Sequence, residues 1–66
     1  MKVIAKKSYG DWVVRLESDV NSDVPFLVTL CCGNKRIDKR SCESRGSAGE
    51  YYRAFMAIAK SRFNPI

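Results

Sequence analysis

The sequence predicts an α+β fold, in which an antiparallel sheet of three to four strands packs on one C-terminal amphipathic helix. Three observations carry this prediction. Residues 12–17 alternate between apolar and polar side chains, residues 26–32 form an unbroken apolar run, and residues 48–63 repeat apolar side chains with a helical period. The 66 residues contain no linker and no internal repeat, so we expect a single small domain spanning residues 1–66.

The N-terminal part of the chain predicts two strands joined by a turn. The segment Lys2–Lys7 has an apolar centre flanked by lysines, which is typical of an edge strand because lysine discourages unwanted pairing. Residues 8–11 supply turn-forming residues. The segment Trp12–Glu17 gathers its large apolar side chains on one face, so it predicts a half-buried strand. Ser, Asp, Asn and Pro residues then make residues 18–25 a loop.

The middle of the chain predicts the central strand and its hairpin partner. The segment Phe26–Cys32 is apolar throughout and rich in β-branched and aromatic residues. Gly33-Asn34 is a two-residue hairpin signal that leads into a returning strand at Lys35–Arg40. That strand carries one large apolar side chain, Ile37, among four basic ones, so we expect an exposed edge or a projecting ribbon. Residues 41–46 are polar and predict a loop.

The last element is a helix predicted over residues 48–63. Ser47 is followed three residues later by Glu50, a spacing that matches a capping box, and Asn64-Pro65 ends the pattern. A step of about 100° per residue collects the large apolar side chains on one arc, which we expect to face the sheet. These residues are Tyr51, Tyr52, Phe55, Met56, Ile58, Ala59 and Phe63.

The residue types exclude most catalytic and metal chemistry. The chain has no histidine, so neither a Ser-His nor a Cys-His nucleophile can form, and its acids are scattered through turns. We therefore expect a non-enzymatic protein without a cofactor or metal. Cys31, Cys32 and Cys42 cannot complete a four-ligand zinc site within one chain. Reduced, largely buried thiols of a cytoplasmic protein are expected, with an intermolecular disulfide or a shared metal in a dimer as the alternative.

Charge is the clearest indicator of a partner. Twelve Lys and Arg residues against seven Asp and Glu residues give a net charge of +5, and a positive surface is typical of nucleic-acid binding. Strand alternation is expected to place Lys35 and Lys39 on one face of the basic ribbon and Arg36 and Arg40 on the other. The candidate contacts to nucleic acid or another partner are Lys35, Arg36, Lys39, Arg40, Arg45 and Arg15.

Other parts of the sequence bear on the same surface. Tyr9 and Trp12 would add stacking contacts if they lay on the sheet face that the helix leaves open. The helix start near Arg45 could hold one phosphate, although a plain N-terminal cap is the simpler interpretation. Residues 17–23 are acidic, which favours a protein partner, since a DNA-binding surface gains nothing from neighbouring acids.

Two segments resemble known DNA-binding domains. Residues 9–16 (YGDWVVRL) and residues 50–63 (EYYRAFMAIAKSRF) look like parts of the three-stranded-sheet-plus-helix domains of plant ethylene-response factors and of phage integrase arm-binding domains. Those domains begin with a glycine, a tryptophan and alternating strand residues, and they end in an alanine-rich helix. They dock the sheet, not the helix, in the major groove, so the resemblance implies a DNA-binding sheet here.

These observations predict a small basic protein of phage or mobile-element type that uses a basic β-ribbon to bind nucleic acid. The alternative is a phage-type inhibitor or adaptor that binds a host nucleic-acid-processing or defence complex, as anti-restriction and anti-CRISPR proteins do. No segment has the length and hydropathy of a membrane span or secretory signal, so we expect no membrane partner and a cytoplasmic location. Because residues 26–32 are apolar on both faces and one helix covers one face, we expect a homodimer that buries the other.

Overall fold

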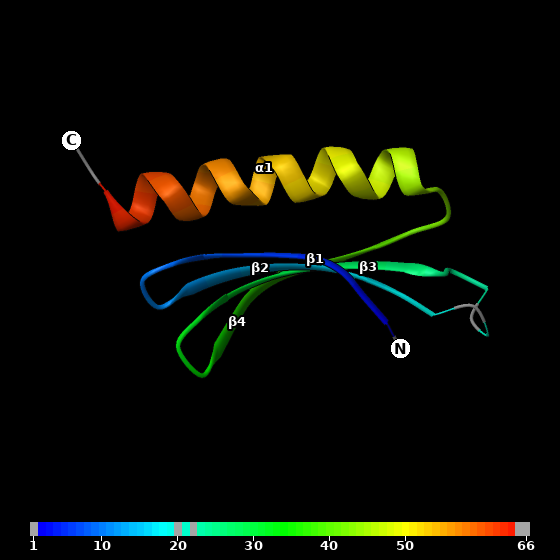
Figure 1. Ribbon diagram of the computed structural model, residues 1–66, viewed down its shortest axis with the longest axis horizontal. Coiled ribbons are helices and arrows are strands. Elements are labelled where there is room, and N and C mark those ends of the chain that lie inside the picture. The colour runs from blue at the N-terminus through cyan, green and yellow to red at the C-terminus, as the bar shows by residue number, and fades with distance from the viewer. Residues whose placement is uncertain (1, 20, 22, 65–66) are drawn as a thin grey trace.

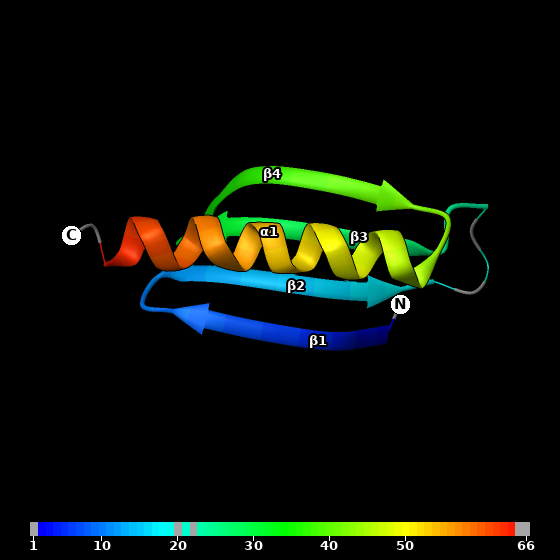
Figure 2. The same ribbon diagram turned by 90° about the horizontal axis from the view of Figure 1, so that it is seen from above.

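The fold joins four strands and one helix in the predicted order. The elements are β1 (Lys2–Tyr9), β2 (Trp12–Ser18), β3 (Phe26–Cys32), β4 (Lys35–Cys42) and α1 (Arg45–Phe63). The computed structural model describes residues 2–19, 21 and 23–64. The strands form one antiparallel sheet in the order β1-β2-β3-β4, and α1 lies along one face of it (Figure 1, Figure 2). This two-layer arrangement confirms the predicted fold class.

Two glycine turns join the hairpins at the same end of the sheet. Gly10 and Gly33 have φ angles of +61° and +60°, a left-handed conformation that strains any residue with a side chain. Each glycine is the first of two turn residues, and among the described residues only glycines have a positive φ. Both features match type II′ hairpin turns. The N–H of Gly33 donates to the carbonyl of Asp11 at 2.9 Å, so the two turns are bonded to each other.

The core lies between α1 and the two central strands. In the register of β2 and β3, Val14 pairs with Leu30 and Leu16 pairs with Val28. All four side chains are at most 5% exposed, and α1 covers them with a stripe of alanines and one phenylalanine. The buried core residues are Val14, Leu16, Val28, Leu30, Cys42, Ala48, Phe55 and Ala59.

The helix begins one turn earlier than the sequence pattern predicts. Ser44, in an extended conformation, is the N-cap, and its hydroxyl accepts a hydrogen bond from the Ser47 N–H at 3.2 Å. The capping-box prediction was therefore wrong in placing the cap at Ser47. The chain offers serine at both positions, and β4 runs on to Cys42, so only two residues remain to link the strand to the helix. The predicted loop over residues 41–46 is correspondingly shorter.

The helix face that contacts the sheet is narrower than predicted. Phe55 is 4% exposed, whereas Tyr51, Ile58 and Phe63 are 42%, 42% and 55% exposed. The prediction that Ile58 faces the sheet was wrong. A single helix centred over β2 and β3 buries only the stripe nearest those strands, so Tyr51 and Ile58 lie on its flank. Phe63 is exposed for a different reason, because it is the last residue of α1 and lies beside the Gly10 turn. At the other end of α1, Asn64 caps the helix by donating its N–H to the Lys60 carbonyl, and the predicted stop residue Pro65 lies outside the described residues.

Candidate nucleic-acid interface

The sheet face opposite α1 is left open by every described part of the chain (Figure 1). Since neighbouring residues of a strand point to opposite faces, the register of the sheet shows which side chains lie on this open face. Lys6 of β1 pairs with Arg15 of β2, Arg15 pairs with Thr29 of β3, and Thr29 pairs with Lys39 of β4. We call these three cations, Lys6, Arg15 and Lys39, the basic row.

The basic row continues into a second row nearer the hairpin turns. There Ser8, Val13, Cys31 and Arg36 lie opposite one another across the four strands. Arg36 therefore adds a fourth cation to the open face. The third row, toward the other end of the sheet, contains Glu17, whose carboxylate lies 3.6 Å from Nε of Arg15. Among the described residues, four cations against one carboxylate leave the open face with a net positive charge.

The centre of the open face is buried although no helix lies over it. Thr29 lies between Arg15 and Lys39 in the basic row, and it is only 7% exposed although no helix covers it. Leu27 and Cys31, its neighbours on the same face of β3, are half-buried. Arg15 and Lys39 flank Thr29 on the two neighbouring strands, and side chains of this kind cover apolar surface with their aliphatic stems while the charged ends remain in water.

A β-bulge in β4 changes which basic residues share a face. Leu30 pairs with Asp38, but the next residue of β3, Cys31, pairs with Arg36, so Ile37 is the extra residue of an irregularity in β4. The bulge reverses the alternation of the strand. The prediction that Lys35 and Lys39 share one face was therefore wrong: Arg36 and Lys39 lie on the open face.

The remaining predicted site residues lie on the helix side of the sheet. Arg40 packs with its guanidinium 5.9 Å from the ring centroid of Tyr51, and it lies 3.9 Å from the carboxylate of Asp38. Lys35 pairs with Cys32, which the register also places on the helix side. Arg45 lies in the first turn of α1, at the end of the sheet away from the hairpin turns. The structure thus brings together Arg15, Arg36 and Lys39, and separates Lys35, Arg40 and Arg45 from them.

Lys6 is the site residue that the sequence interpretation missed. The signal was present in the turn, because Tyr9 pairs with Trp12 across Gly10-Asp11, and counting outward by three residues on each strand reaches Lys6 and Arg15. The predicted strand ended at Lys7, which hid this register. Pairing the two strands outward from the turn would have placed Lys6 opposite Arg15.

The aromatic side chains do not contribute to the open face. Trp12 pairs with Cys32 on the helix side, and Tyr9 packs with Trp12 against the core there. Tyr52 of α1 lies in the same environment, where burial, with a contribution from Tyr9, raises the pKa of its phenol. Stacking of bases on Trp12 or Tyr9 from the open face is therefore excluded by their position.

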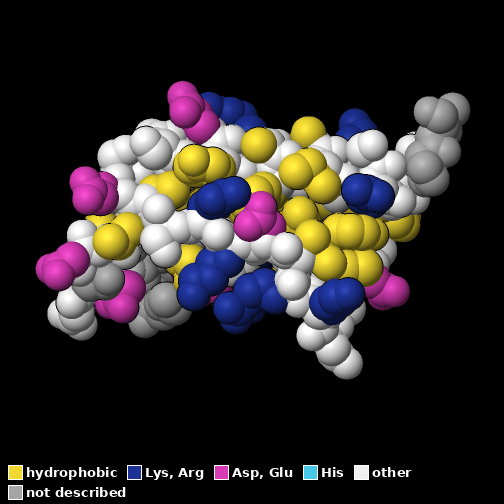
Figure 3. Space-filling view, turned by 180° about the vertical axis from the view of Figure 1, so that it is seen from behind, with side chains coloured by type: hydrophobic (Ala, Val, Ile, Leu, Met, Phe, Trp, Pro, Cys, Tyr) yellow, Lys and Arg dark blue, Asp and Glu magenta, His cyan; other side chains and the backbone are white. Residues whose placement is uncertain are grey.

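The connection between β2 and β3, which carries Asp19 and Asp23, lies at the far end of the sheet from the hairpin turns. Asp19 is tied into this loop, since its N–H donates to the Pro25 carbonyl at 2.7 Å and its carboxylate accepts from the Asn21 N–H at 3.1 Å. Figure 3 shows several acidic side chains at that end and basic ones near the middle of the molecule, with an acidic side chain among them. Glu17 of the same acidic stretch does reach the basic row, where it pairs with Arg15.

The cysteines offer no cross-link or metal site within the described residues. Cys31 and Cys32 lie on opposite faces of β3, and Cys42 pairs with Phe26, five residues and about 17 Å along the strand from Cys31. A disulfide needs Cα atoms within about 7 Å, so Cys42 cannot reach either of the others. Burial also raises the pKa of the Cys42 thiol. The described residues contain no cluster of three or more Cys, Asp or Glu side chains suited to a metal ion.

Comparison with known proteins does not identify a relative. No protein-family model, no curated protein and no solved structure matches this chain. The resemblance to ethylene-response-factor and integrase arm-binding domains therefore stays a hypothesis. In the described part of the chain, α1 lacks the hydropathy needed to cross a membrane.

Proposed function

We propose that this chain is a small non-enzymatic protein that binds the phosphate backbone of double-stranded nucleic acid through its open sheet face. The observation that carries the proposal is the basic row, with Arg36 beside it, on a face that contains one carboxylate. Phosphate contacts from Lys and Arg supply most of the affinity of sequence-independent binding.

The width of the basic row suits a duplex. Neighbouring strands lie about 4.8 Å apart, so Lys6 on β1 and Lys39 on β4 are separated by about 14 Å. The major groove of B-DNA is about 12 Å wide, so cations at the two edges of the sheet can approach the backbones on both sides of the groove. The absence of aromatic side chains among the described residues of this face disfavours single strands, whose binding depends on base stacking.

The proposal is tested by comparing two variants that lose the same charge. In the first, Lys6→Gln, Arg15→Gln and Lys39→Gln remove the basic row but keep long side chains over Thr29. In the second, Arg53→Gln, Lys60→Gln and Arg62→Gln remove three exposed cations from α1. Fluorescence anisotropy with a random duplex should show at least tenfold weaker binding for the first variant and less than threefold for the second. Equal losses, or tighter binding to a single strand of the same length, would overturn the proposal.

The homodimer predicted from the sequence is not part of this proposal. Its premise was an exposed apolar face, but within the single chain Thr29 is buried and Leu27 and Cys31 are half-buried. A two-fold dimer through the open face would also set the basic row against its own copy, and like charges in contact are unfavourable. The open face of the single chain is therefore accessible to nucleic acid.

A second candidate function is binding to an acidic protein surface, as an inhibitor or adaptor would do. Exposed apolar side chains favour this function. Along β4 and the flank of α1, Ile37, Tyr51 and Ile58 are each more than 40% exposed. Figure 3 shows apolar side chains on this side interleaved with basic ones. A pull-down from nuclease-treated host lysate that captures a partner with the native chain, and loses it with Tyr51→Ser and Ile58→Ser, would support this function over the first.

A further inference from the structure

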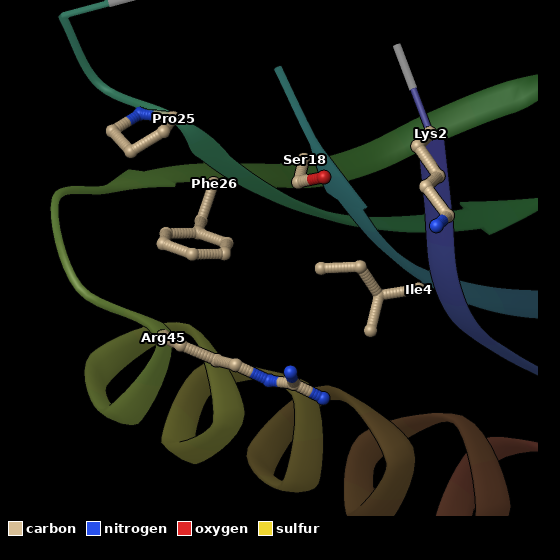
Figure 4. A pocket seen from close by; sticks show the side chains of 6 residues that line it. All are labelled: Lys2, Ile4, Ser18, Pro25, Phe26 and Arg45. Atoms are coloured by element: carbon tan, nitrogen blue, oxygen red, sulfur yellow. The ribbon is translucent and has the colours of Figure 1, made fainter. Parts of the chain in front are cut away.

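A hollow lies on the helix side of the sheet, at the end away from the hairpin turns. It is a pocket of about 470 Å³ between the first turn of α1 and the ends of β1, β2 and β3. Figure 4 shows side chains from all of these elements around one space. The lining residues are Lys2, Ile4, Ser18, Pro25, Phe26 and Arg45.

The pocket exists because α1 does not cover the whole width of the sheet. α1 lies over β2 and β3, so the start of β1 has no helix above it (Figure 2). The register of β1 also shifts between Val3 and Ala5, which leaves Ile4 as the extra residue of an irregularity. Bulges of this kind redirect a side chain, and here Ile4 turns into the pocket, toward Phe26 across the open space (Figure 4).

The charges of the pocket are positive and uncompensated. Lys2 and Arg45 extend toward the pocket from opposite sides (Figure 4), and neither belongs to an ion pair found among the described residues, which join Arg15 to Glu17 and Arg40 to Asp38. The hydroxyl of Ser18 lies on the same wall as Lys2, its partner in the β1–β2 register. The pocket therefore combines two cations and a hydroxyl donor.

The floor of the pocket is apolar. Ile4, Pro25 and Phe26 are half-buried, and the ring of Phe26 lines one side of the space. Two cations beside an aromatic and aliphatic floor complement a ligand that has one anionic part and one apolar part. Its charged part would be a phosphate or carboxylate, and its other part would be flat and apolar. Pockets of about 300–1,000 Å³ are typical of small-molecule sites.

We propose that this pocket binds a small organic anion with an aromatic body, such as an aryl phosphate, between Lys2 and Arg45. The site is independent of the proposed nucleic-acid interface, because the pocket lies on the helix side of the sheet and the basic row lies on the opposite face. The aromatic body would lie against Phe26 and Ile4, while the anion accepts hydrogen bonds from the two cations and from Ser18.

The binding experiment uses phenyl phosphate as the probe, followed by two-dimensional NMR of the full chain. We expect saturable shifts in the amide signals of Ile4, Ser18 and Phe26. Inorganic phosphate lacks the aromatic body and benzyl alcohol lacks the charge, so each should bind at least tenfold more weakly. Shifts centred on the basic row, or equal affinity for phenyl phosphate and inorganic phosphate, would overturn the proposal.

Charge-matched variants test the assignment of the two cations. Lys2→Gln with Arg45→Gln should weaken phenyl phosphate binding at least tenfold, whereas Arg53→Gln with Lys60→Gln should change it less than twofold. All four side chains are exposed, so both variants should fold, and the dispersion of the NMR signals checks this directly. Equal weakening in the two variants would show that the probe responds to net charge alone, which would contradict a defined site.

Discussion

Replacing Gly10 with alanine should destabilise the chain more than the same change at Gly33. The two glycines have nearly equal φ angles, +61° and +60°, so the strain of placing alanine in a left-handed conformation is the same, about 1–2 kcal/mol. Their surroundings differ. A Cβ atom on Gly10 would lie 2.6 Å from Cε1 of Phe63, whereas a Cβ atom on Gly33 meets nothing within 4 Å.

The difference between the two variants follows from the contact with Phe63. The methyl group of Gly10→Ala must push the ring away, and Phe63 then loses the burial that the turn provides. Phe63 is 55% exposed, so at most slightly less than half of its surface is at stake. Fully burying a phenylalanine side chain is worth about 1.5–3 kcal/mol, so the lost contact amounts to about 1 kcal/mol. Gly10→Ala should therefore cost about 2–3 kcal/mol, and Gly33→Ala about 1–2 kcal/mol.

The assay is urea denaturation followed by circular dichroism, with both variants also made in a Phe63→Ala background. Because a chain of this size holds only about 3–5 kcal/mol in total, a stabilising osmolyte should be present in every sample. Without the ring, Gly10→Ala and Gly33→Ala should cost the same. If the two variants were equal in the native background, or if the excess at Gly10 persisted without Phe63, the packing of the helix end on the turn would be refuted.

Three further predictions concern the core, the thiols and the oligomeric state. Phe55→Ala should cost about 3–5 kcal/mol and leave the chain unfolded by circular dichroism, while Ile58→Ala should melt cooperatively near the native temperature; the reverse order would mean that α1 is rotated. Because burial raises the pKa of Cys42, less of it is thiolate at pH 7–8, so iodoacetamide should label it more slowly than Cys31 in mass spectrometry; equal rates would contradict its burial. Light scattering at about tens of micromolar should give a mass near 7.5 kDa, since the open face needs no second copy to cover it, and twice that mass would restore the predicted homodimer.

The sequence was most informative where one local rule determines the structure. The bounds of β3 agree with the apolar run at residues 26–32, and Gly33-Asn34 forms the predicted two-residue turn. Strand alternation also holds along β3, although the sequence left open which face the helix covers: Val28 and Leu30 lie under the helix, and Leu27 and Thr29 lie on the open face. These features depend on apolar patterning and on the conformational freedom of glycine, both of which are visible in the residues themselves.

The candidate site was only partly predictable, because it depends on pairing between strands. The bulge at Ile37 changes which basic residues of β4 lie on the open face, and no residue type in that segment predicts a bulge. Lys6 joins the basic row only through the register set by the Gly10 turn. The helix start was ambiguous for a different reason: Ser44 and Ser47 both suit an N-cap, and the length of β4 decides between them.

The central claim is that the basic row contacts nucleic-acid phosphates, and the salt dependence of binding tests it most directly. Each phosphate neutralised on B-DNA contributes about 0.9 to the slope of log affinity against log salt concentration. Removing the basic row with Lys6→Gln, Arg15→Gln and Lys39→Gln should therefore make the slope on a random duplex shallower by about 2–3. The variant with Arg53→Gln, Lys60→Gln and Arg62→Gln should keep the native slope. A native slope near zero, or the same slope in both variants, would contradict the claim that the open sheet face is the nucleic-acid interface.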